Sequence, residues 1–133
     1  KDLPVGVHTP RKNKFEMFKK SLLIIKEYNF NPEKVLIDHI SSSEMLREVL
    51  KNGFYAGISV NNSKLSINEA RVLIEEAFGW NKNLMNRIML NSDIIKDDIS
   101  EYFPFVNFEN VVNDDMCAVL GQTANTFFGL NKQ

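Results

Sequence analysis

The segment Val35–His39, an apolar run that ends in an acid and a histidine, constrains the fold most strongly. A short, continuous apolar run is typical of a strand that is buried on both faces of a parallel sheet. Asp38 and His39 then fall at the carboxyl end of the strand, where barrels and open α/β sheets carry their functional residues. The segment therefore predicts a parallel α/β fold with its chemistry at one rim.

Two other segments repeat this pattern. Val5–Val7 is followed directly by His8, and the apolar stretch 87–90 leads into Asn91, Ser92 and Asp93. A further strand is expected at Ala56–Val60. The carboxyl ends of parallel strands meet at one edge, so these segments predict a single rim that carries His8, His39 and Asp93.

Helical patterns separate the expected strands. Apolar residues recur at three- and four-residue spacing over Phe15–Tyr28, and a serine run precedes a second helix at 45–50. Ser66 and Glu69 form a capping box for a third helix, which ends near Gly79. Strand, helix and strand in this order form βαβ units, whose right-handed crossovers predict four parallel strands in sequential order with helices outside.

Four βα units amount to half of a (β/α)₈ barrel, which typically takes about 250 residues. A small open sheet is the alternative, but such sheets usually bind ligand through a glycine-rich first turn, and Thr9–Lys12 contains no glycine. Helical segments are expected at 109–120 and 123–130, after an acidic and aromatic loop at 97–108. No linker divides residues 1–133, so we expect one partial barrel domain.

Composition narrows the environment and the partners. A net charge of −1 argues against broad attraction to nucleic acid or membranes, and no apolar run approaches the roughly 20 residues that span a bilayer. The single cysteine, Cys117, excludes an internal disulfide, fits a reducing, cytoplasmic setting, and is expected to be a buried, inert thiol. The chain begins without Met or leader, so we expect it to be part of a longer protein.

His8, His39 and Asp93 are the candidate metal ligands. Imidazole is the commonest transition-metal ligand, carboxylate is its usual partner, and catalytic sites keep about three protein ligands beside an open position. Each histidine could instead be a hydrogen-bonded rim residue. Asp38 neighbours His39 on an expected strand, so we expect it to point away, toward the helices, in a supporting role.

Candidate substrate-binding residues follow the same strands. Arg11 and Lys12 open a basic stretch after His8 that suits a phosphate group, although a solvated helix face explains the same charges. Asn91 could bind a ligand, orient Asp93 or cap the turn. The aromatic residues of the loop 97–108 could cover the rim as a lid or simply pack within the loop; they are Phe103, Phe105 and Phe108.

Several short motifs, in this order and spacing, resemble the second half of TatD-type metal-dependent hydrolases, and most closely the archaeal-type branch. They are Val-His-Thr-Pro at 7–10, Ile-Asp-His at 37–39, Tyr-Ala-Gly-Ile-Ser at 55–59, Asn-Ser-Asp at 91–93 and the terminal Asn-Thr-Phe-Phe-Gly-Leu at 125–130. The resemblance covers nearly the whole chain. It implies the C-terminal half of an amidohydrolase-like TIM barrel.

The resemblance also implies roles for the rim residues. His8 would stand on the fifth barrel strand, His39 on the sixth and Asp93 on the eighth, where the family binds one or two divalent ions such as Zn, Mn or Mg. Asp93 would also help to activate the attacking water. The family's first-strand His-x-His and fourth-strand acid have no counterpart here, since those strands would precede Lys1.

Three functions remain open from the sequence. The first is a metal-dependent hydrolase that cleaves a phosphodiester or amide-type bond, with DNA as a candidate substrate. The second is a non-catalytic half-barrel that needs an upstream half or a second chain to complete it. The third is a free-standing open α/β binding domain, which an exposed rim without ligands would favour.

Overall fold

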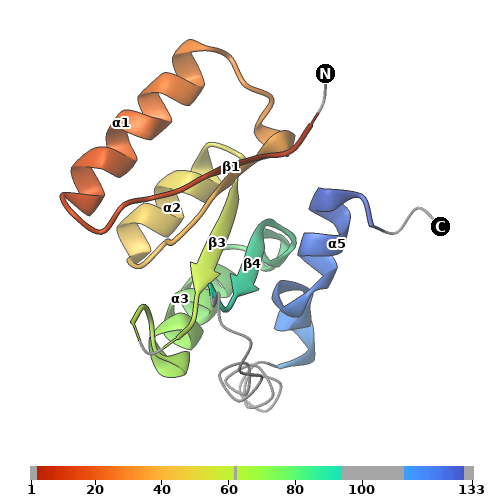
Figure 1. Cartoon of the computed structure of the whole chain (residues 1–133). Coiled ribbons are helices and arrows are strands. Elements are labelled where there is room, and N and C mark those ends of the chain that lie inside the picture. The colour runs from red at the N-terminus through yellow and green to blue at the C-terminus, as the bar shows by residue number, and fades with distance from the viewer. Residues whose placement is uncertain (1–2, 62, 94–112, 131–133) are drawn as a thin grey trace.

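The computed structural model describes the chain over residues 3–61, 63–93 and 113–130. Four strands form one parallel sheet in the order β1-β2-β3-β4 (Figure 1). Their bounds are β1 Val5–Val7, β2 Val35–Ile37, β3 Tyr55–Ser59 and β4 Ile88–Asn91. The predicted parallel pairing and sequential order are therefore confirmed.

Helices occupy the predicted connections between the strands. They are α1 Lys14–Glu27, α2 Ser43–Lys51 and α3 Ile67–Trp80, with short 3₁₀ turns η1 Pro32–Lys34 and η2 Lys82–Arg87 leading into β2 and β4. After β4 the described chain resumes with η4 Asp114–Leu120 and α5 Gln122–Phe128, which lies beside β4 in Figure 1. The expected loop 97–108 and its phenylalanines lie outside the described residues.

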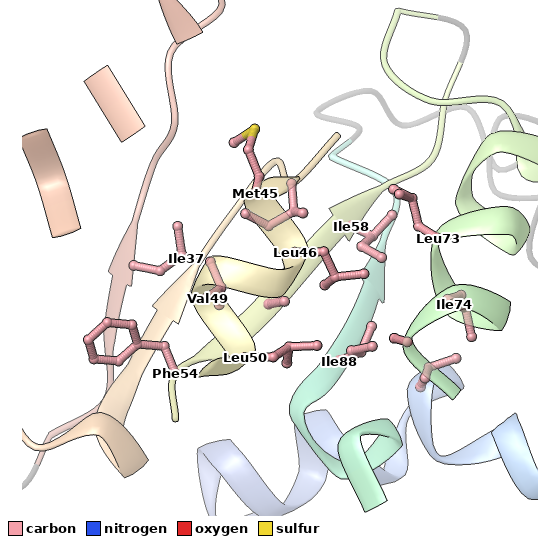
Figure 2. Close-up of a cluster of buried hydrophobic side chains, with 14 of the residues drawn as sticks. Ile37, Met45, Leu46, Val49, Leu50, Phe54, Ile58, Leu73, Ile74 and Ile88 are labelled. Atoms are coloured by element: carbon pink, nitrogen blue, oxygen red, sulfur yellow. The ribbon is translucent and has the colours of Figure 1, made fainter. Parts of the chain in front are cut away.

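The two faces of the sheet bury different partners. On β3, Ala56 and Ile58 point to the helices and join a core with α2 and α3, whose side chains meet those of Ile37 and Ile88 in Figure 2. Tyr55 and Met89 alternate with these residues and pack on the other face against Phe127 of α5. Full burial of one aliphatic side chain contributes about 1.5–3 kcal/mol. Because the helix-facing cluster contains many more buried residues than the opposite face, it holds most of the stabilising apolar surface.

Asp38 corrects one expectation about orientation. β2 ends at Ile37, and Asp38 continues the face of Leu36, the face opposite the helices, instead of turning toward the helices. His39 then adopts a left-handed backbone with φ of 61°. This breaks the strand alternation, so both His39 and Asp38 point to the inner face, where the sequence pattern had placed only one.

Cys117 corrects another. It lies on η4 with an exposed side chain, whereas the apolar neighbours Met116 and Val119 are buried. The sequence pattern predicts a buried thiol, but the buried positions of η4 are Met116 and Val119, on either side of the cysteine. None of the described helices is long and apolar enough to cross a bilayer.

The predicted capping box at the start of α3 is present and yields a pH-dependent prediction. The Ser66 backbone N–H and, next, its hydroxyl donate to Glu69 at 2.8 and 2.7 Å and hold the pKa of Glu69 below its ordinary value of 4.5. Because the pKa of Glu69 is lower in the folded chain than in the unfolded chain, its ionised carboxylate stabilises the fold at pH above 4.5. This stabilisation is lost as the pH falls through the lowered pKa.

Ser66→Ala should therefore lower the free energy of unfolding by about 1 kcal/mol at neutral pH. It should also make the loss of stability on acidification shallower, because Glu69 loses its hydroxyl donor. Urea unfolding at neutral pH and below the ordinary pKa of glutamate measures both effects. An equal pH dependence in the wild-type and variant chains would contradict the role of the capping box.

Candidate active site

The two histidines meet at the carboxyl end of the sheet. The residue after β1, His8, places Nδ1 2.9 Å from Nε2 of His39, with the two rings nearly perpendicular at 83°. The other nitrogen of His39, Nδ1, lies 2.7 Å from Oγ of Ser59, the last residue of β3. His39 is buried at 4% exposure while His8 is open to solvent, so His39 is the fixed member of the pair.

Asp38 ties three strand ends together. Its Oδ1 accepts hydrogen bonds from the backbone N–H of His39 at 2.8 Å and from Nδ2 of Asn91 at 2.9 Å. It also lies directly over Gly57, where an added Cβ would come within 2.4 Å of the same oxygen. Because the carboxylate and a side chain at 57 cannot share this space, Gly57 is what allows Asp38 to reach Asn91.

Asp93 lies on the other side of the His39 ring. Its Oδ2 is 3.9 Å from Nδ1 of His39 and 3.2 Å from Nζ of Lys64, whose side chain is only 13% exposed. Like His39, Asp93 has a left-handed backbone, with φ of 49°. Such conformations are uncommon outside glycine and concentrate at functional sites.

The donor set fits a divalent cation in its chemistry. Two imidazoles and two carboxylates at one rim are ligands that zinc and manganese accept. The geometry is incomplete: within residues 3–61, 63–93 and 113–130, no three His, Cys, Asp or Glu side chains are placed to hold one ion. His8 and His39 face one another, but Asp93 lies beside Nδ1 of His39 and is paired with Lys64. The described residues thus bring two imidazoles together without a third ligand beside them.

Burial sets the charge state of the central histidine. It lowers the pKa of His39; the carboxylates of Asp38 and Asp93 oppose this effect, while Lys64 and His8 add to it. A lowered pKa keeps the imidazole neutral to more acidic pH, and the neutral ring is the form that ligates a metal.

The structure separates the predicted substrate-binding residues. Arg11 lines a pocket next to His39, whereas Lys12 is exposed and is not among the residues that line this pocket. The amide nitrogen of Asn91 is bonded to Asp38, and its buried Oδ1 has no hydrogen-bond partner in the described part of the chain. Asn91 is not among the residues that line the pocket.

Sequence reasoning missed Ser59 and Lys64. Ser59 is the polar residue that ends β3, and Lys64 follows it in the loop to α3, so the rule that identified His8 and His39 applies equally to this strand. A polar residue does follow the apolar positions of β3, but it is a serine and not a histidine or an acid. Ser59 fixes one nitrogen of His39, and Lys64 fixes Asp93.

No family model matches the chain. A curated relative, an uncharacterized metal-dependent hydrolase of Methanocaldococcus jannaschii, is 33% identical over 101 residues, which is 74% of this chain and 37% of that protein. The chain thus spans well under half the length of this relative.

A solved TatD-like protein from Archaeoglobus fulgidus matches 96% of this chain and 48% of its own, with 25% identity and a TM-score of 0.66. The chain is similar to this TatD-like protein. The phosphotriesterase homology protein of Escherichia coli, solved with phosphate in its active site, shares the fold at a TM-score of 0.70 and 17% identity, with 94% of this chain and 48% of that one covered. The chain forms half a TIM barrel, as the resemblance of its motifs implied, and not the small open sheet that its strand spacing also allowed.

Proposed function

We propose that this rim is part of a metal-dependent hydrolase site that cleaves phosphate esters, with DNA among the candidate substrates. The observation that carries the proposal is the pairing of His8 with His39 at 2.9 Å on a TatD-like rim that also holds Asp38 and Asp93. The names of the M. jannaschii relative and the phosphate-bearing E. coli neighbour support the reaction and substrate class.

Each rim residue has a distinct part in this proposal. His8 and His39 would hold the cation, with Zn, Mn and Mg as candidates, and Ser59 fixes the His39 ring through Nδ1. When bound, such a cation stabilises charge on phosphoryl oxygens and acidifies water. Asp93 would accept the proton of the attacking water, because its carboxylate lies beside His39 and is oriented by Lys64.

Substrate binding would involve three residues around these ligands. Arg11, at the edge of the pocket, would bind a phosphate oxygen, and Oδ1 of Asn91, which has no partner among residues 3–61, 63–93 and 113–130, would accept a hydrogen bond. Lys12, exposed on the same loop, would add longer-range attraction for an anion.

Metal binding is the first test. Titration with Zn²⁺ or Mn²⁺ should show saturable binding, and His39→Ala should weaken it by at least the 10–100-fold that losing a ligand's supporting partner costs. The exposed Cys117 could bind zinc by itself, so Cys117→Ser is the control that must leave the affinity unchanged. Hydrolysis of bis(4-nitrophenyl) phosphate should then require metal and stop with a chelator. Metal binding unaffected by His39→Ala would contradict the assignment.

A non-catalytic half-barrel is the second candidate, and the incomplete ligand geometry favours it. β1 and β4 each pair with one strand in the described sheet, and Leu3 and Val5 are exposed beside β1. Open edges invite pairing with another chain. We propose that an upstream half-barrel or a second chain completes the barrel. Self-association in sedimentation experiments together with absent metal binding would support this candidate over the enzyme.

A further inference from the structure

The pocket that Arg11 lines adjoins the histidine pair. It encloses about 250 Å³ among the loops that follow β1, β2 and β3, and Ser59 and the buried His39 form part of its wall. Its polar rim consists of Arg11, Lys14, Ser41, Ser63 and Lys64. The volume lies below the roughly 300–1,000 Å³ of pockets for drug-sized ligands, so it suits one small group of a larger molecule.

The charge in this pocket is strongly positive. Lys64 is paired with Asp93, but in the described part of the chain no carboxylate lies within ion-pair distance of Arg11 or Lys14. Burial lowers the pKa of Lys14 most; the charges of Lys64 and Arg11 lower it further, and the carboxylate of Asp38 opposes them. Crowding like charges costs free energy, and a bound anion would offset that cost.

The pocket is built before any ligand arrives. Asn61 donates from Nδ2 to the carbonyl of Ser92 at 2.7 Å, while its Oδ1 accepts from the backbone N–H and hydroxyl of Ser63 at 2.8 and 2.9 Å. Arg11 in turn donates to the carbonyl and Oγ of Ser63 at 3.1 and 2.9 Å. The guanidinium is therefore fixed across two loops, which reduces the entropy lost on binding.

The amino end of α2 adds to the positive electrostatic potential of the pocket. Ser41 lines the pocket just before this nine-residue helix, which begins at Ser43 after its N-cap Ser42. The amino end of a helix carries partial positive charge and attracts anions. The helix end and the three cations thus act in the same direction.

We propose that this pocket is a subsite for a phosphate group of the substrate that adjoins the scissile bond. An arginine fork and the Lys14 ammonium suit the several oxygens of a phosphate group better than the two oxygens of a carboxylate. The subsite depends on the proposed function in one respect: the phosphate that it binds belongs to a substrate that is cleaved at the same rim. It predicts a substrate with a second phosphate next to the bond that is cleaved.

Calorimetric titration of the metal-free chain with inorganic phosphate, in chelator and at low salt, tests the subsite without needing hydrolysis. We expect saturable binding near the millimolar range, weakened about tenfold or more in Arg11→Gln/Lys14→Gln. The matched control is Lys51→Gln/Lys82→Gln, which removes the same charge from exposed positions outside the pocket and should change affinity by less than about twofold.

The outcomes separate the subsite from the enzyme. Phosphate binding that depends on Arg11 and Lys14 supports the subsite even if the chain hydrolyses nothing, in which case only the proposed function fails. The subsite is overturned if wild-type chain shows no saturable phosphate binding, if both double variants weaken it equally, or if acetate competes as well as phosphate does.

Discussion

Replacing Asp93 with asparagine is expected to lower kcat for a phosphodiester about 100-fold or more, with the fold retained. Asparagine keeps the shape of the side chain but removes the charge and the basicity needed to accept a proton from water, and lost general-base help costs 10²–10⁴-fold. The substitution also breaks the 3.2 Å ion pair with Lys64. Initial rates with saturating metal and substrate measure the effect.

Two comparisons make the Asp93 result specific. Asp114→Asn removes the same charge from an exposed position at the start of η4, outside the rim, and should leave kcat unchanged. Metal affinity should fall far less in Asp93→Asn than in His39→Ala if Asp93 acts mainly on the proton. A kcat close to that of the wild-type chain would remove Asp93 from the chemistry.

Gly57→Ala is expected to destabilise the chain by about 1–3 kcal/mol, the usual cost of forcing extra volume into a packed site. The new methyl would come within 2.4 Å of Oδ1, 3.1 Å of Cγ and 3.3 Å of Cα of Asp38. Asp38 would have to move, and its hydrogen bonds to His39 and Asn91 would move with it. Urea unfolding measures the stability, and metal titration measures the effect on the histidine pair.

Gly6→Ala is the matched control for Gly57→Ala. Gly6 also lies within a strand of the sheet, yet a Cβ there meets no atom within 4 Å, so its substitution should be nearly neutral. In an Asp38→Ala background the penalty of Gly57→Ala should shrink, because the two sites share one volume. Equal losses at positions 6 and 57 would show that the close contact with Asp38 is unimportant.

The strand and helix pattern could be predicted because each element carries its own local signal. The apolar run before Asp38 and the capping box of Ser66 and Glu69 depend on neighbours in the chain, and both appear where expected. Gly53, with φ of 75°, also ends α2 as a left-handed residue, which the Asn-Gly pair after that helix predicts.

The details of the rim could not be predicted in the same way. Strict alternation from Ile37 would place His39 on the helix face, and only its left-handed backbone brings it to the same inner face as Asp38. The approach of Lys64 to Asp93 depends on a loop ordered by Asn61 against the end of β4, a contact that spans 31 residues. Nothing local in the sequence encodes such a contact.

The sequential order of the strands has a consequence for how the chain folds. Each strand pairs with the strand before it along the chain, so every new βα unit can dock on the one just completed. The best-covered element is β3, in which all five residues are buried, whereas β1 has two exposed residues of three. Amide hydrogen exchange should be slowest in β3 and fastest in β1, with β1 opening first.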